Sequence, residues 1–343
     1  MRISEFDYEL PPELIAQTAA ERRDGSRMLV VDRTSGSFED QSFTDLPVFV
    51  RSGDLIVVNN TKVFPARLIG RSETGARIEA FLVAETSDGC WDVLAKPAKR
   101  LHQGKRIIFD KRLSAVVIEK LSDGKVRLNF ESDGDFYDIL NGIGRTPLPP
   151  YIKRDQTNVD TDRERYQTVY AKERGAIAAP TAGLHFTPAM FDLLRNAGAE
   201  IAEITLHVGY GTFEPIRAED LADHHVSPES YSISDHTADM LDRAKSEGRR
   251  IIAVGTTTTR ALESSITATG IFGSGHSLAE LTLRPGYKFR AVDALLTNFH
   301  LPQSSLLLLT SSFGGHGLIM DAYRHAVRER YRFYSYGDCM LIV

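Results

Sequence analysis

The chain has only two cysteines in 343 residues, Cys90 and Cys339, and they lie far apart in the sequence. This number and separation imply neither a disulfide framework nor a C-x-x-C metal site. Long apolar runs are missing as well: stretches such as residues 306–309 are far shorter than the roughly 20 residues of a membrane-spanning helix. The N-terminal residues include Glu5 and Asp7, where a secretory signal has an apolar core. We therefore expect a soluble cytoplasmic protein with no membrane partner.

A general excess of basic charge is also absent. The formal net charge is −5 and the sequence pI is about 6.1, which argues against a general polyanion binder. Residues 96–112 are an exception, with seven basic residues and one acidic residue. They form either a solvated basic hairpin or a patch for a phosphate backbone. The remaining composition, 42% hydrophobic and 25% charged residues, is typical of a globular protein long enough for two domains.

Short β-rich runs follow one another closely from residue 67 onward. Asp-Gly pairs at 88–89 and 123–124 separate some of them, and Asp-Gly between alternating runs is a strong hairpin signal. Several short strands joined by regular turns are typical of a small antiparallel barrel or sandwich. A proline-rich stretch, 144–150, ends this segment. The expected strands cover 67–70, 77–83, 91–95, 106–109, 115–121 and 125–130.

The rest of the chain alternates between strand and helix patterns, which favours an α/β fold with a mostly parallel sheet. Strands are expected over 28–32, 54–59, 175–179, 201–206, 251–254, around 295 and over 306–310; helices are expected near residue 10 and over 188–197, 238–247, 257–268 and 319–329. We therefore predict a discontinuous α/β catalytic domain of residues 1–62 and 152–343. It is interrupted by an inserted small antiparallel β-barrel domain, residues 63–151.

Two loops carry glycine, histidine and aromatic residues directly after expected strands. In open α/β sheets, ligands bind beyond the carboxyl ends of the strands. Glycine lets the backbone approach a ligand closely, and histidine titrates near neutral pH. We therefore expect both loops to build one site, in which each histidine is either a catalytic or substrate-contacting residue or a hydrogen-bonded structural one. The residues are Thr181, Gly183 and His185 in one loop and His207, Gly209, Tyr210, Gly211 and Phe213 in the other.

Two further loops repeat this arrangement. Residues 251–263 have the pattern of a strand, a glycine turn and a threonine-rich helix start, which binds ligand oxygens or simply caps the helix. Neither a Walker motif nor a dinucleotide-binding motif is present there. The strand around 295 ends in polar residues as well. The candidates for substrate binding in these two loops are Gly255, Thr256, Thr257, Asn298 and His300.

The segment that joins the two predicted domains adds Asn60, Thr61 and Arg67, which would line an interdomain cleft. Glu214 is a candidate general base, a partner for a cation, or a solvated loop carboxylate. The three loop histidines lack close ligand spacing and evident carboxylate partners, so no metal is predicted. Arginines interleave with aromatic residues over 328–336, which favours a half-buried strand over an RNA-stacking surface.

Several segments together resemble one known family. They are 24–30, 59–68, 165–170, the loops 179–186 and 206–213, and 254–257, 293–302 and 331–338, in order across nearly the whole chain. The chain is similar to the S-adenosylmethionine:tRNA ribosyltransferase-isomerases of queuosine biosynthesis. The resemblance implies an α/β domain with an inserted β-barrel. It also implies transfer of the ribosyl part of S-adenosylmethionine to tRNA that carries 7-aminomethyl-7-deazaguanine in the anticodon, with isomerisation to epoxyqueuosine.

The resemblance further implies that adenine and methionine leave, so S-adenosylmethionine is a consumed substrate and no cofactor is expected. Both departures need proton transfer, for which His185, His207 and Glu214 are the candidates. Tyr210 and Phe213 would face the sulfonium through their rings. We expect a monomer. The anticodon stem-loop would be held by basic residues of the barrel, namely Lys96, Lys99, Arg100 and Lys105.

One motif departs from the family pattern, and two rival functions stay open. Where the family has His-x-x-His-x-Glu, this chain has Ser227 in place of the second histidine, between His224 and Glu229. Either His225 substitutes for the missing histidine, or a histidine at this position is not essential. An S-adenosylmethionine-dependent tRNA methyltransferase would show a glycine-rich first strand–helix turn, which is not found. A non-catalytic RNA-binding protein would leave the histidine and threonine loops unexplained.

Overall fold

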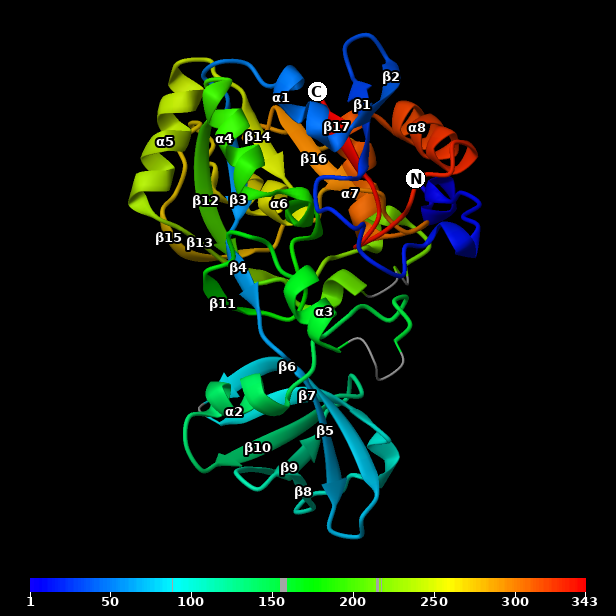
Figure 1. Cartoon of the computed structure of the whole chain (residues 1–343), viewed down its shortest axis with the longest axis vertical. Helices are drawn as coiled ribbons and strands as arrows, with labels where there is room; N and C mark the ends of the chain where they lie inside the picture. Colours follow the sequence, from blue (N-terminus) through cyan, green and yellow to red (C-terminus); the bar gives the residue numbers. More distant parts are fainter. Residues whose placement is uncertain (88, 155–158, 214–215, 217) are drawn as a thin grey trace.

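The computed structural model describes residues 1–87, 89–154, 159–213, 216 and 218–343. Figure 1 shows two bodies, a larger α/β part that contains both chain termini and a smaller β-barrel below it. The chain leaves the larger body after β4 (Thr61–Val63), builds the barrel, and returns to the larger body. The predicted fold class, an α/β domain with an inserted antiparallel barrel, is confirmed.

The main sheet has nine strands in the order β15-β13-β12-β3-β14-β16-β17-β1-β2. Its centre is parallel: β12, β3, β14 and β16 run in one direction. β17 and β1 run parallel to each other and antiparallel to β16, so the sheet as a whole is mixed. The strands are β1 (Arg27–Asp32), β2 (Ser37–Ser42), β3 (Leu55–Asn59), β12 (Glu200–Leu206), β13 (Glu229–Ile233), β14 (Ile251–Val254), β15 (Gly275–Ala279), β16 (Ala294–Asn298) and β17 (Cys339–Ile342).

Helices cover both faces of this sheet. Alternate residues of the central strands point into two different cores, as the period of a strand requires. Residues of α5 (Asp235–Ser246), α6 (Thr256–Ser265), α7 (Ser305–Gly314) and α8 (His316–Arg328) contribute to one core, and residues of α1 (Leu46–Phe49) and α4 (Pro188–Asn196) to the other. Within the described residues, no helix is both long and apolar enough to cross a membrane.

The smaller body is a closed barrel in the order β10-β7-β6-β5-β8-β9. All six of its strands were expected from the sequence. Closure leaves no free sheet edge, and the inward residues form a core of their own, capped by α2 (Phe136–Ile143). Ile177, which follows β11 (Glu173–Ala176), also packs into this core. The strands are β5 (Arg67–Ser72), β6 (Arg77–Ser87), β7 (Cys90–Lys96), β8 (Arg106–Asp110), β9 (Leu113–Lys120) and β10 (Val126–Ser132).

Four local predictions were wrong. The strand expected over 175–179 ends at Ala176 and pairs with β4 in a separate two-stranded sheet, because the following residues pack against the barrel and a cavity. Residues 306–310 belong to helix α7, which Ser304 caps; a short apolar run alone does not separate strand from helix. The helix near residue 10 is only a turn, Pro12–Leu14. The arginine–aromatic stretch is a loop before β17, in which Arg330 and Tyr334 have positive φ.

The remaining helix of the described chain is α3 (Val159–Arg165), which follows the return from the barrel. Its Asp162 lies in the larger body's interior, where Arg154 binds its carboxylate at 2.6 Å and Tyr336 donates to it at 3.0 Å. The returning chain is therefore tied to the loop that precedes β17. Tyr151 precedes Arg154 in the sequence, and Tyr166 follows Asp162. Both tyrosines lie at the edge of the sheet where the parallel strands end.

Candidate functional site

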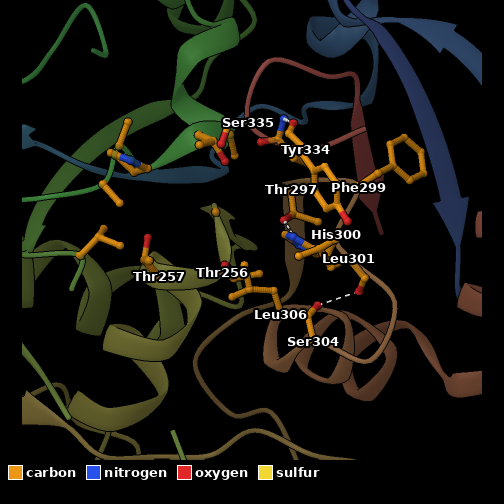
Figure 2. A pocket seen from close by; sticks show the side chains of 18 of the residues that line it. Thr256, Thr257, Thr297, Phe299, His300, Leu301, Ser304, Leu306, Tyr334 and Ser335 are labelled. Carbon is orange, nitrogen blue, oxygen red and sulfur yellow. Dashed lines mark hydrogen bonds between the residues drawn. The ribbon is translucent and has the colours of Figure 1, made fainter. Parts of the chain in front are cut away.

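A cavity opens beyond the carboxyl ends of β14 and β16, the two neighbouring parallel strands at the centre of the sheet. About 850 Å³ of space lies between its lining side chains, part of it open to solvent. Figure 2 shows Thr256 and Thr257 on one side of the cavity and His300 and Tyr334 on the other. Six of the residues predicted to bind substrate line it, namely Thr181, Gly255, Thr256, Thr257, Asn298 and His300.

The threonine loop contributes two of its four threonines to the cavity. Gly255 has φ of 95°, a left-handed conformation that favours glycine, and this turn lets α6 start directly after β14. Thr258 and Thr259 bond back, from their Oγ1 atoms to the carbonyl oxygens of Val254 (2.7 Å) and Gly255 (3.1 Å). Thr256 and Thr257 face the cavity instead. The loop therefore does more than cap a helix.

Asn298 ends β16 and is oriented by its neighbours. Its Nδ2 lies 3.2 Å from Nε2 of His185 and 3.2 Å from the carbonyl oxygen of Tyr334. Nδ1 of His185 lies 2.9 Å from Oγ of Ser26, and burial lowers the pKa of His185 to about 4. The imidazole is thus neutral, with Nδ1–H donating to Ser26 and Nε2 accepting from Asn298. Nδ2 is thus occupied by these acceptors, while Oδ1 of Asn298 has no hydrogen-bond partner among the described residues.

His300 and Tyr334 form the opposite wall. Nε2 of His300 lies 2.9 Å from Oγ1 of Thr297, and burial lowers the pKa of this imidazole to about 3, so it is neutral. Tyr334 has φ of 72°, which is uncommon for a bulky residue and clusters at functional sites. Its ring stacks on Tyr151 at 4.5 Å, and burial raises the pKa of its hydroxyl, which stays protonated. The sequence pattern of the C-terminal stretch did not single out Tyr334 as a cavity residue.

Three buried polar atoms of the cavity residues have no hydrogen-bond partner among the described residues. They are Oγ1 of Thr257, Oδ1 of Asn298 and the hydroxyl of Tyr334. Buried polar atoms in proteins are nearly always paired, and an unpaired one costs about 1–3 kcal/mol. The described part of the lining contains no Asp, Glu, Lys or Arg side chain. The cavity is therefore suited to a ligand that supplies hydrogen-bonding groups of its own.

His207 lies in a second cavity, so the two loop histidines do not share one site as expected, although Val208 of the second loop lines the first cavity. Its Nδ1 is 2.8 Å from Oγ1 of Thr61, and burial is the main cause that lowers its pKa. Asn60 lines the same cavity and bonds to Glu203 and Thr205. The two histidines are separated because the chain that follows β11 runs to the centre of the sheet and places the 179–186 loop there. His207, in contrast, directly follows β12 and lies beside that strand. His185 itself reaches the first cavity only through Asn298.

Other predicted substrate residues support the fold around the cavity. A side chain at Gly183 would place Cβ 2.0 Å from the Tyr170 hydroxyl, so this glycine is needed for close packing. The N–H of Gly209 donates to Glu229 (2.9 Å), and Tyr210 packs on Phe81 of the barrel, with ring centroids 5.9 Å apart. Gly211 lines a small adjoining cavity that shares Thr256 and Thr257 with the first.

Three more predicted residues remain to be placed. Arg67 binds Glu79 (3.6 Å) and the Leu148 carbonyl oxygen (3.4 Å) and does not line the first cavity. Glu214 lies outside the described residues. Phe213 is described only as the last residue of a short helical turn. The proposed proton-transfer role of Glu214 and the proposed ring contact of Phe213 therefore stay predictions.

A buried ion pair was missed by the sequence reasoning. Arg260 of α6 binds Glu229 of β13 at 2.7 Å, and both side chains are buried. Glu229 also holds the N–H of Gly209, so the pair fixes the 206–213 loop against the helix that begins at the cavity. Glu229 is the final residue of the motif in which Ser227 replaces a histidine. The motif was visible in the sequence, but Arg260 on α6, the ion-pair partner of Glu229, is 31 residues away along the chain.

The predicted tRNA contacts lie on the barrel. Lys96, Lys99 and Arg100 are exposed at and after the end of β7. Lys105 is half-buried, and its Nζ donates to the Arg100 carbonyl oxygen (3.0 Å). In the part of the chain that the structure covers, none of these four side chains forms an ion pair. Their charges are thus free to interact with a polyanion.

Fold and site together define an α/β protein with an inserted barrel that binds a small molecule at the carboxyl edge of its sheet. Comparison with known proteins identifies the family: the model of the family described as queuosine biosynthesis protein matches residues 3–342. This chain belongs to that family, as the sequence motifs indicated.

Two relatives and one solved structure illustrate the similarity. The chain is 48% identical over 345 residues to S-adenosylmethionine:tRNA ribosyltransferase-isomerase of Syntrophotalea carbinolica. It is 49% identical over 344 residues to the protein of the same name from Citrifermentans bemidjiense, and both alignments cover 100% of each chain. The crystal structure of S-adenosylmethionine tRNA ribosyltransferase from Thermotoga maritima is 35% identical, with a TM-score of 0.55, over 99% of this chain and 100% of that one.

Proposed function

We propose that this protein is an S-adenosylmethionine:tRNA ribosyltransferase-isomerase. It transfers the ribosyl part of S-adenosylmethionine to the aminomethyl group of 7-aminomethyl-7-deazaguanine in a tRNA anticodon and isomerises it. The products are epoxyqueuosine-tRNA, adenine and methionine. Full-length relatives with this name support the activity, and they do not support methyl transfer or non-catalytic RNA binding. Such an enzyme would work in the cytoplasm, where tRNA is modified, and we expect it to act as a monomer.

The observation that carries the proposal is the cavity at the carboxyl ends of β14 and β16. S-adenosylmethionine has a flat base, ribose hydroxyls, a sulfonium and an amino-acid end. The unpaired atoms of Thr257, Asn298 and Tyr334 offer hydrogen bonds to such groups, and the stacked rings of Tyr334 and Tyr151 offer an aromatic surface for a cation or a base. The mostly apolar remainder would keep water away from the reacting carbons.

The barrel supplies the proposed tRNA contact, with Lys96, Lys99, Arg100 and Lys105 holding the phosphate backbone. In this arrangement residues 1–62 and 152–343, together with Tyr151 at the predicted boundary, bind S-adenosylmethionine and carry out the chemistry, while the barrel within residues 63–151 holds the tRNA. Loss of a proton beside the sulfonium starts the rearrangement, since the positive sulfur acidifies that carbon. His185 acts through Asn298, which it orients, and so is a positioning residue in this proposal. Glu214 remains a candidate for proton transfer, whereas His207 lies in a different cavity from the proposed S-adenosylmethionine site.

Adenine release tests the proposal. The full chain is mixed with S-adenosylmethionine and tRNA that carries 7-aminomethyl-7-deazaguanine, and adenine is followed by chromatography. We expect adenine, methionine and a nucleoside that gains the mass of the ribosyl-derived ring. The matched control is tRNA with guanine in place of the modified base. If methyl-labelled S-adenosylmethionine instead transfers its label and no adenine forms, the protein is a methyltransferase and the proposal is wrong.

A further inference from the structure

Two helices point their N-termini at the first cavity, and they differ in how their free N–H groups are satisfied. The first-turn N–H groups of a helix have no partner within the helix. At α7, Oγ of Ser304 accepts from the N–H of Leu307, so that end is capped by its own side chain. At α6 the N-cap is Gly255, which has no side chain to do this. The start of α6 therefore keeps donors available for a ligand.

A second, independent feature lies at the same place. Thr257 is 9% exposed, and its Oγ1 has no hydrogen-bond partner among the described residues, although it can donate one hydrogen bond. Its neighbours Thr258 and Thr259 bond back to the chain instead. The hydroxyl of Thr257 thus joins the first-turn N–H groups of α6 in one group of donors that line the cavity.

The charge of the cavity limits what these donors bind. The described lining residues include no Lys or Arg, and His300 is neutral, so no side chain there compensates a buried anion. The positive end of the α6 dipole is the available compensation, and helix N-termini bind anionic oxygens well. Burying an anion elsewhere in this cavity would be costly. An anionic group of the ligand is therefore favoured at the start of α6 over any neutral group, such as a ribose hydroxyl.

Asn298 is placed to complete the recognition. Val254 pairs with Leu296 across β14 and β16, so the start of α6 and the last residues of β16 lie at the same edge of the sheet. Asn298 is 2% exposed, and its unpaired Oδ1 is an acceptor fixed by the bonds that its Nδ2 makes to His185 and Tyr334. A donor group of the ligand fits this oxygen. The carboxylate and the ammonium of an amino acid would supply this pair, an anionic acceptor for the start of α6 and a donor for Oδ1 of Asn298.

We propose that the amino-acid end of S-adenosylmethionine binds between α6 and Asn298. Its carboxylate accepts from Oγ1 of Thr257 and from the first-turn N–H groups of α6, and its ammonium donates to Oδ1 of Asn298. This inference rests on the proposed function for the identity of the ligand. It places the sulfonium and ribose toward the Tyr334 side of the cavity, across from Thr257 (Figure 2). Methionine, the product that keeps this end, leaves from the same place.

The test compares equilibrium binding of S-adenosylmethionine with that of decarboxylated S-adenosylmethionine, by calorimetry without tRNA. The wild-type chain should bind the decarboxylated ligand at least about tenfold more weakly, the usual effect of losing a charge-assisted hydrogen bond. Thr257→Val should weaken S-adenosylmethionine about tenfold and leave the decarboxylated ligand nearly unchanged, so that the preference shrinks. Thr257→Ser keeps the hydroxyl and should restore the preference. Thr259→Val, with its Oγ1 directed at Gly255 and not at the cavity, is the matched control and should keep the wild-type preference.

The outcomes separate this inference from the proposed function. If the wild-type chain binds both ligands equally tightly, or if Thr257→Val weakens both to the same extent, the orientation is wrong while the proposed function stands. If neither ligand binds, with or without tRNA that carries guanine in place of the modified base, the proposed function fails at this cavity as well. The wild-type comparison needs no variant, so it decides even if Thr257→Val does not fold.

Discussion

Mild acid should destabilise this protein through two buried histidines near the cavity. Burial lowers the pKa of His185 to about 4 and of His300 to about 3, from an ordinary value of 6.5. In the unfolded chain both imidazoles take up protons as the pH falls below 6.5, whereas in the folded chain they stay neutral down to about 4 and 3. The unfolded state then binds more protons, so stability decreases as the pH falls through this window.

The size of the effect follows from these values. At pH 5, protonation of the unfolded chain costs about 2 kcal/mol of folding stability per histidine, or about 4 kcal/mol for both. Since a whole protein is stable by only about 5–15 kcal/mol, this loss would be large. At pH 7.5 both imidazoles are neutral in either state, so this cost is absent. Carboxylates of ordinary pKa, 3.8 for Asp, titrate mostly below this window.

Urea denaturation at pH 7.5 and pH 5.0, followed by circular dichroism, measures the difference. Trp91, the one tryptophan of the sequence, lies in the barrel core, and its fluorescence checks whether both bodies unfold in one step. His185→Gln and His300→Gln should each remove about 2 kcal/mol of the difference between the two pH values, whatever they do to stability at pH 7.5. Equal stability of the wild-type chain at both pH values would refute the reasoning, since it would mean that these imidazoles titrate normally.

Four other perturbations have defined outcomes. Thr257→Val should leave the ligand-free chain equally stable or about 1 kcal/mol more stable, since it removes an unpaired buried hydroxyl; a loss above that size in urea denaturation would show that the hydroxyl is paired. Glu229→Gln should cost about 3–5 kcal/mol, because it leaves Arg260 buried without its counter-charge; a thermal melt unchanged from wild type would contradict this. Gly183→Ala should lower the melting temperature, as its Cβ would overlap the Tyr170 hydroxyl, and a wild-type melt would rule out that contact. Lys99→Glu should weaken tRNA binding and lower the slope of log affinity against log salt by about 1 or more, and an unchanged slope would remove this residue from the interface.

The barrel was predictable because its strands are read from local signals. Alternating residues and Asp-Gly turns lie within a few positions of each other, and a hairpin needs nothing more distant. All six expected strands are present, although β6 runs four residues further than expected, to Ser87. The central strands β3 and β14 were predictable for a related reason: both are buried along their whole length and have apolar runs between polar turns.

The site was harder to predict because its parts meet only in three dimensions. The sequence identified Thr257 at a helix start that follows one expected strand and Asn298 at the end of another, and the parallel pairing of β14 and β16 brings these two segments together. It could not show that His207 would stay in another cavity, since that depends on β11 pairing with β4 outside the main sheet. Tyr334 was missed because an arginine–aromatic alternation also fits a strand, and its positive φ is a tertiary feature without a local signal.

The histidine of the 179–186 loop illustrates how a correct motif can suggest an incorrect contact. A histidine after a glycine at a strand end is expected to face the ligand, yet His185 is buried behind Asn298. A protonated imidazole there would present a second N–H donor to the Asn298 amide, and this donor could be accepted only if the amide turned by 180°. Oδ1 would then face His185, and Nδ2 would face the cavity. In the proposed complex the low pKa of His185 would thus keep an acceptor, and not a donor, toward the ligand, so this residue would influence the ligand without touching it.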